Sequence, residues 1–145
     1  MTLTNLLGIS LDAVKADKAL VGKLLAAAQR NITDSQLQGL SAENRFDAAY
    51  KAIIQSAMVA LNANGYRTLT SKPGHHRTAI QNLPLSVNLP QAQVIVLDAL
   101  RKQRNLSDYS GDLISDAASA ECLTCAIDLL EHVLGWLKTQ RPDLL

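Results

Sequence analysis

SAENRFDAAYKAIIQSAMVALNANGY, residues 41–66, is the stretch that decides the fold of this 145-residue chain. Ser41 is a residue type that caps helix N-termini, Glu43 favours the positive end of a helix, and Gly65 follows the last turn. On a helical wheel the apolar residues between these marks form one stripe and the polar residues lie opposite. The apolar stripe comprises Phe46, Ala49, Tyr50, Ile53, Ile54, Ala57, Ala60 and Leu61, and the polar face comprises Asp47, Lys51, Gln55 and Asn62. The stretch therefore predicts a core helix with one solvated face.

Further helices are expected on both sides of this one. Before it, apolar spacing predicts a helix over roughly residues 11–30 that packs on the core helix. After it, Pro73 and Gly74 mark a loop, a short helix is expected near residues 75–83, and Pro84 and Pro90 bracket another loop. A helix then runs from Pro90 to Gly111. The segment from Ser115 to Pro142 predicts a last helix of about 25 residues, apolar on more than one side, as in a central or subunit-interface helix.

Composition sets the class of protein. Hydrophobic residues make up 48% of the chain but aromatic residues only 3%, so Leu, Ile, Val and Ala must build one core. We therefore predict a single domain over residues 1–145, an all-α antiparallel, up-and-down bundle of four to five helices. The net charge of +1 argues against a generally basic, DNA-binding surface. Two cysteines without a leader or a long uncharged apolar run predict a cytoplasmic protein with no membrane segment.

RKQRNLSDYSGD, residues 101–112, is the candidate functional segment. As a helix it places five polar residues on an arc of about 140°: Arg101, Arg104, Asn105, Asp108 and Tyr109. One interpretation is a surface ladder of ion pairs, Asp98 with Arg101 and Arg104 with Asp108, each worth only about 0.2 to 0.5 kcal/mol. The other is a guanidinium fork for phosphate with a phenol on which a base can stack.

Three segments together resemble a known family. RFDAAYKAIIQSAMVALNANGYR, KPGHHRTAI and LRKQRNLSDYSGD, in this order and before a long C-terminal helix, resemble HEPN domain proteins (higher eukaryotes and prokaryotes nucleotide-binding). The resemblance covers roughly residues 40–138. It implies a helical bundle that forms a homodimer and binds RNA or a nucleotide. In the family an arginine holds the scissile phosphate and a histidine four to six residues later works on the ribose 2′-hydroxyl, without a metal.

The resemblance assigns roles to individual residues. Arg104 and Asn105 match the family's RN opening, while Tyr109 and Asp108 stand where the histidine is expected, as in branches whose motif ends in DY. Arg104, Asp108 and Tyr109 are thus the candidate catalytic residues, and Arg101 and Asn105 the candidate binding residues. A phenol is a poor base at neutral pH, so the sequence leaves open whether the protein cleaves RNA. The resemblance also implies a possible nucleotidyltransferase antitoxin as partner, for which Tyr109 would accept AMP.

A histidine pair and a cysteine pair are two further candidates for a catalytic, binding or metal site. His75 and His76 are candidate bases or binding residues from the loop, although adjacent histidines at a helix start are also typical solvated residues. Cys122 and Cys125 have no second cysteine pair, which favours buried structural thiols and predicts neither a metal site nor a cofactor. The leading hypothesis is an RNA- or nucleotide-binding protein, for which the resemblance also implies descent from the ribonuclease of a toxin–antitoxin pair, in degenerate form. The alternative is a non-catalytic helical protein–protein interaction module.

Overall fold

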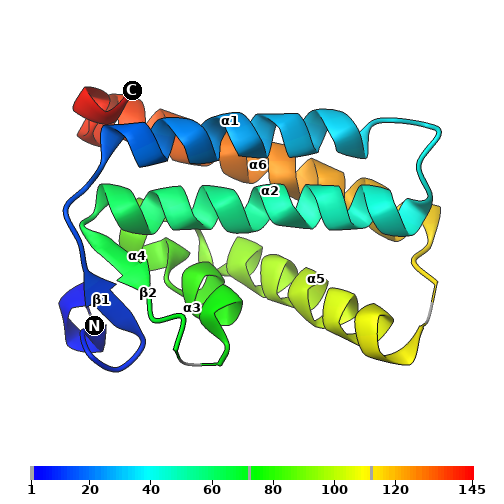
Figure 1. The fold of residues 1–145 in the computed structure, drawn as a ribbon, viewed down its shortest axis with the longest axis horizontal. Helices are drawn as coiled ribbons and strands as arrows, with labels where there is room; N and C mark the ends of the chain where they lie inside the picture. Colours follow the sequence, from blue (N-terminus) through cyan, green and yellow to red (C-terminus); the bar gives the residue numbers. More distant parts are fainter. Residues whose placement is uncertain (1, 72, 112) are drawn as a thin grey trace.

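The protein is described by a computed structural model that covers residues 2–71, 73–111 and 113–145. Lys72 and Asp112, which belong to two of the quoted segments, lie outside the described residues. The helices are α1 (Lys18–Ser35), α2 (Ala42–Ala63), α3 (His75–Gln81), α4 (Leu83–Val87), α5 (Gln91–Ser110) and α6 (Asp116–Gln140). Two short strands, β1 (Leu11–Ala13) and β2 (Tyr66–Thr68), pair antiparallel. The described chain is therefore an all-α helical bundle with one small two-stranded sheet (Figure 1).

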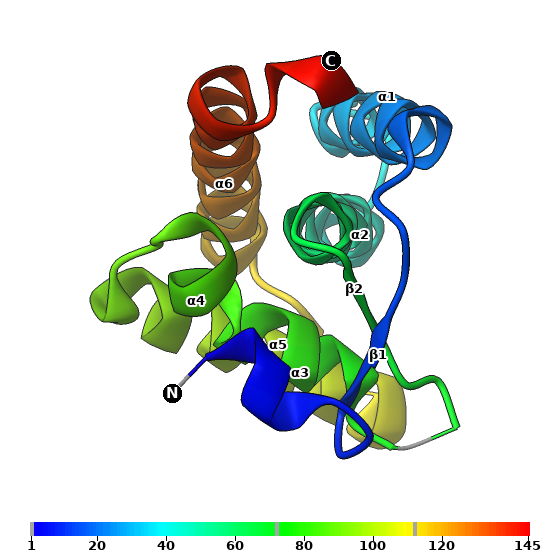
Figure 2. The same cartoon turned by 90° about the vertical axis from the view of Figure 1, so that its left-hand side faces the viewer.

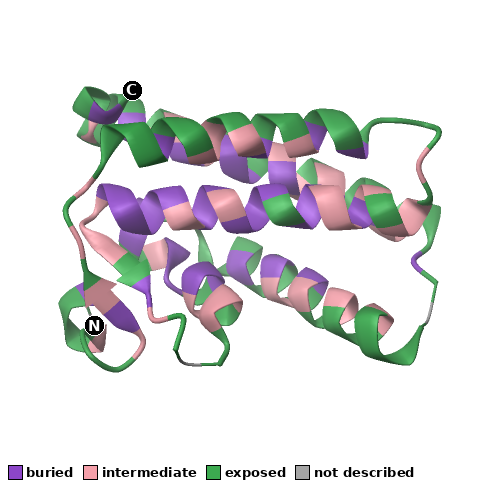
Figure 3. Cartoon of the chain, in the orientation of Figure 1, coloured by how far each residue is buried: buried purple, intermediate pink, exposed green. Residues whose placement is uncertain are grey.

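Helix α2 is the centre of the bundle. It lies between α1 and α6, with α3 and α5 along its other side (Figures 1 and 2), and most of its length is buried (Figure 3). The predicted cap is confirmed, because the Ser41 hydroxyl accepts the N–H of Asn44 at 3.1 Å. The prediction of a solvated Asn62 is wrong. Its side chain is only 5% exposed, and its Oδ1 accepts the backbone N–H of Asp17 at 3.0 Å.

Helix α1 begins later than the predicted residue 11. The Asp17 carboxylate accepts the N–H groups of Ala19 and Leu20 at 2.9 and 3.3 Å, which fixes the first turn. The residues before it form β1, whose partner β2 lies in YRTLTSKPGHHR, residues 66–77, a segment for which the sequence predicts a loop around Pro73 and Gly74. The late start of α1 and the presence of β2 have one cause. The two strands pair across more than 50 positions of the chain, and the residue pattern near either strand does not indicate this pairing.

The region between the two prolines also differs from the prediction. Residues 84–90 were expected to be a loop, but Leu83–Val87 form α4. Pro84 occupies the first turn of this helix, where its missing N–H removes no intrahelical hydrogen bond. The short helix α3 and the helix after Pro90 are confirmed, and α5 ends at Gly111 with a φ of 73°. This left-handed conformation favours glycine over any residue with a Cβ.

Helix α6 has the predicted length of 25 residues. Its large buried side chains, such as Leu129, Val133 and Leu137, belong to the hydrophobic core. The central position in the bundle, however, belongs to α2 (Figure 2). Among the described residues, the large apolar side chains of α6 are at most partly exposed, whereas Ile95, Leu106 and Tyr109 of α5 are exposed. None of the described helices is long and apolar enough to cross a membrane.

Candidate functional site

Three helices bring polar side chains together near the middle of α5. Arg101 and Arg104 lie one turn apart and continue the side of α5 on which Leu97 and Leu100 are buried, as the sequence predicted. Helix α2 contributes Asp47 and Tyr50, also one turn apart, and α3 contributes His76. We call Asp47, Tyr50, His76, Arg101 and Arg104 the Arg104 cluster.

Arg104 is held loosely at the centre of this cluster. Its guanidinium carbon lies 5.0 Å from the centroid of the Tyr50 ring, which is a cation–π contact. The nearest carboxylate oxygens are 3.7 Å away on Asp47 and 3.9 Å away on Asp108, both beyond hydrogen-bonding distance. The Nε atom of Arg104 is shielded from solvent and has no hydrogen-bond partner among the described residues. The side chain as a whole is 28% exposed, so a ligand can still reach its outer nitrogens.

Tyr50 connects Arg104 to a histidine. Its hydroxyl lies 3.2 Å from Nδ1 of His76, and the two rings are 5.8 Å apart. Burial raises the pKa of Tyr50 to about 12, despite the opposing charges of Arg104 and Arg101, so the hydroxyl keeps its proton. Burial, followed by the neighbouring His75 and the two arginines, lowers the pKa of His76. At neutral pH the cluster therefore contains a neutral imidazole beside a cationic guanidinium.

Carboxylates limit how much positive charge the cluster presents. The Arg101 Nε donates to Asp98 at 2.8 Å, and Lys102 lies 3.4 Å from the other oxygen of the same carboxylate. Burial disfavours the charged form of Asp98, but the hydrogen bonds and charges of Arg101 and Lys102 together outweigh burial and lower its pKa. Asp47 behaves differently, because burial raises its pKa more than the charge of Arg104 lowers it. Arg101 is thus firmly paired, and Arg104 is the cation that is more available to an anion.

The structure divides the predicted site residues between two sides of α5. Arg101, Arg104 and Asp108 lie on or beside the cluster, and His75 adjoins it through its ring, 4.7 Å from that of His76. Asn105 and Tyr109 instead line a shallow hollow of about 510 Å³ with Lys102, Leu106 and Ser110. The Tyr109 side chain is 93% exposed. The predicted arc is therefore not one surface, because its two ends point in different directions around the helix.

The cysteines lie on α6, and Cys122 is close enough to the cluster to interact electrostatically with Tyr50 and Asp47. Cys122 is buried, its Sγ 3.7 Å from the carbonyl oxygen of Phe46, and Cys125 is partly buried. Burial raises the pKa of both thiols, which disfavours the reactive thiolate form. Among the described residues no group of three or more His, Cys, Asp or Glu side chains has an arrangement that could hold a metal ion.

Sequence reasoning missed two members of the cluster. Tyr50 was assigned to the apolar core and Asp47 to the solvated face. Tyr50 is indeed only 1% exposed, yet its hydroxyl reaches His76, and the Asp47 carboxylate turns toward Arg104. The one sequence signal was their spacing of three residues on a helix, which is too common to identify a site.

Comparisons with known proteins gave no significant match to a family model, a curated protein or a solved structure.

Proposed function

We propose that the Arg104 cluster binds the phosphate of an RNA strand or a nucleotide. The observation that carries the proposal is the state of Arg104: its two carboxylate neighbours are 3.7 and 3.9 Å away, beyond hydrogen-bonding distance, and its side chain is 28% exposed, so that its outer nitrogens are accessible to a ligand. Two oxygens of one phosphate offer the bidentate acceptor that these carboxylates do not provide. The resemblance to HEPN proteins points to the same ligand class from the RN pair at Arg104 and Asn105.

The test is binding of a fluorescein-labelled single-stranded RNA, followed by fluorescence anisotropy at low and moderate salt. Arg104→Ala should weaken binding by about 1.5 to 3 kcal/mol, the range for a hydrogen bond to a charged group. Arg104→Lys should recover only part of this loss, because an ammonium cannot form the bidentate fork. Arg30, which is exposed on α1, provides the matched control, and Arg30→Ala should bind like the wild type.

Circular dichroism of each variant separates loss of binding from loss of fold. A folded Arg104→Ala protein with wild-type affinity would contradict the proposal. Negligible binding by the wild-type protein would contradict it as well and would leave the interaction module as the better hypothesis.

Metal-independent cleavage of RNA is a second candidate activity, favoured by the position of His76. The α5 segment lacks a histidine, but α3 supplies one beside Tyr50 and Arg104. In the tautomer whose Nδ1–H donates to the Tyr50 oxygen, the free Nε2 of the imidazole can accept a proton from a ribose 2′-hydroxyl. The 2′-oxygen then attacks the adjacent phosphorus, whose phosphate Arg104 holds, and the 5′-oxygen leaves and takes a proton from water. If the protein cleaves RNA in the presence of EDTA, His76→Gln should abolish cleavage and leave binding within about twofold.

The exposed end of α5 suits a protein partner. Tyr109 and Leu106 project into solvent, and an exposed phenol is accessible to a modifying nucleotidyltransferase of the kind that the resemblance implies. The same side chains favour the alternative of an interaction module without nucleic-acid binding. The RNA-binding measurements above distinguish these two functions, because an interaction module does not depend on Arg104 for RNA affinity.

A further inference from the structure

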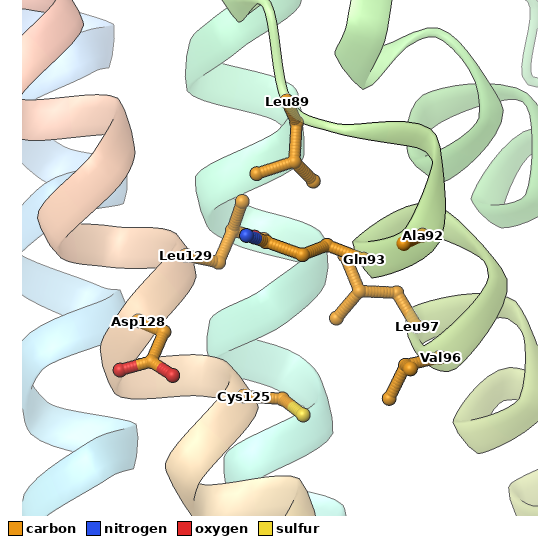
Figure 4. A pocket seen from close by; sticks show the side chains of 8 residues that line it. All are labelled: Leu89, Ala92, Gln93, Val96, Leu97, Cys125, Asp128 and Leu129. Atoms are coloured by element: carbon orange, nitrogen blue, oxygen red, sulfur yellow. The ribbon is translucent and has the colours of Figure 1, made fainter.

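A second surface feature lies between α5 and α6, separate from the Arg104 cluster. It is a groove of about 350 Å³ whose walls are largely aliphatic, with Leu89, Val96, Leu97 and Leu129 among its lining residues. Figure 4 shows the side chains of α5 and α6 on the two sides of this groove, with Leu89 above them. Val96 is 37% exposed, so the apolar lining extends to the surface of the molecule.

The α6 side of the groove is acidic. Asp128 lines it, and Glu121 and Glu131 lie seven positions before and three after Asp128, on or near the same face of the helix. All three residues are exposed, and none forms an ion pair with another residue in the described parts of the chain. No lysine or arginine is among the described residues that line the groove, in contrast to the Arg104 cluster.

The pKa of Cys125 reflects the negative charge around the groove. This residue lies in the groove between Glu121 and Asp128 along α6. Burial raises its pKa, and the charges of Glu121 and Asp128 raise it further. The groove therefore combines an apolar lining with a negative potential, which disfavours RNA and favours a cation attached to an apolar group.

We propose that this groove binds an amphipathic helix of a partner protein that carries aliphatic side chains on one face and lysine or arginine beside them. Aliphatic side chains at helical spacing enter a groove between two helices, as in other helix-in-groove complexes. Basic residues next to them reach Asp128 and Glu121 at the α6 side. The occupant is chosen by charge complementarity and does not depend on RNA binding at Arg104.

The probe is a designed helical peptide with leucine at positions i, i+3, i+4 and i+7 and lysine at flanking positions. A matched peptide carries glutamate in place of each lysine. We expect the lysine peptide to bind the full-length protein and to shift the backbone amide resonances of Leu89 and of residues 91–97 and 125–129. Asp128→Lys should weaken its binding about tenfold, since it replaces an attractive charge with a repulsive one. Asp34→Lys, the same change on the exposed surface of α1, should leave the affinity unchanged.

A second variant tests the apolar half of the proposal. Val96→Asp puts a charge into the groove from an already exposed position, and it should abolish the resonance shifts without unfolding the protein. Equal binding of the two peptides, no binding of the lysine peptide, or shifts that map elsewhere would overturn the proposal. So would the same resonance shifts on raising the protein concentration alone, which would assign the groove to a second copy of the chain. RNA affinity of Asp128→Lys, measured in parallel, should not fall, so failure here leaves the Arg104 proposal unaffected.

Discussion

At the scale of single residues, the properties of the Arg104 cluster follow from partial burial beside a charge. Burial favours the neutral form of both Tyr50 and His76. The two nearby arginines lower the pKa of both side chains, which favours the charged form of Tyr50 but the neutral form of His76. A cation lowers the pKa of a phenol because it stabilises the phenolate anion, and it lowers the pKa of an imidazole because it repels the imidazolium cation. The result is a protonated phenol hydrogen-bonded to a neutral histidine, an arrangement in which His76 has a fixed orientation.

His76 makes the stability of the protein depend on pH. Its pKa in the folded state is lowered from the ordinary value of 6.5 by burial first, and then by His75, Arg104 and Arg101. Below pH 6.5 the unfolded state therefore binds this proton more readily, and the free energy of unfolding decreases as the pH falls through the folded pKa. Urea unfolding at pH 7.5 and 5.5 should show a larger loss for the wild type than for His76→Gln, which cannot take up this proton. An equal loss in both proteins would mean that His76 is not held in the neutral form.

Individual residues also mark the limit of sequence analysis at this site. The inward direction of Arg101 and Arg104 was predictable, because it continues the buried direction of Leu97 and Leu100 on one helix. His76 was a candidate from the sequence, but its contact with Tyr50 was not predictable, since 26 and 54 positions separate Tyr50 from His76 and from Arg104. Without the packing of α2 against α3 and α5, a buried tyrosine is indistinguishable from any other core aromatic residue.

At the scale of elements, helices with local end signals were predicted well. Ser41 and Gly65 bound the central helix, and Gly111 ends α5, because caps and left-handed turns depend on residues within one turn. The start of α1 and the pair of strands were missed. Their positions depend on contacts between the segment around Leu11 and the segment around Thr68, which the periodicity of either segment does not contain.

The cap of α1 gives a direct test of this account. Asp17→Ala removes the acceptor for two N–H groups and should lower the free energy of unfolding by about 1 kcal/mol. Asp17→Asn should retain most of the stability, because asparagine caps about as well as aspartate. Asp34→Ala, at the other end of the same helix, should not destabilise the protein, since a negative charge near a helix C-terminus is unfavourable. Urea denaturation of the three variants measures each change, and a neutral Asp17→Ala would show that the strands alone fix the start of the helix.

At the scale of the whole molecule, α5 separates surfaces of different character. Its inner side near Arg104 is cationic but partly neutralised, and its first half borders an apolar groove with acidic residues on α6. Its last turns expose Leu106 and Tyr109 to solvent. A net charge of +1 is thus an average over local surfaces of opposite sign, which is why composition excluded a basic face but not a local phosphate site.

The exposed end of α5 also changes where a homodimer is expected. The sequence pointed to α6 as the interface, but the most exposed large apolar side chains near the helices are Leu106, Tyr109 and the following Leu113, at 66%, 93% and 87%. An apolar surface of this kind favours self-association through burial of the same patch on both copies. We predict a mass of twice 15.6 kDa by light scattering at micromolar concentration. Leu106→Glu should give a monomer, whereas Leu37→Glu, at an exposed leucine in the turn between α1 and α2, should not. A wild-type monomer would exclude the dimer, and a dimeric Leu106→Glu protein would place its interface elsewhere.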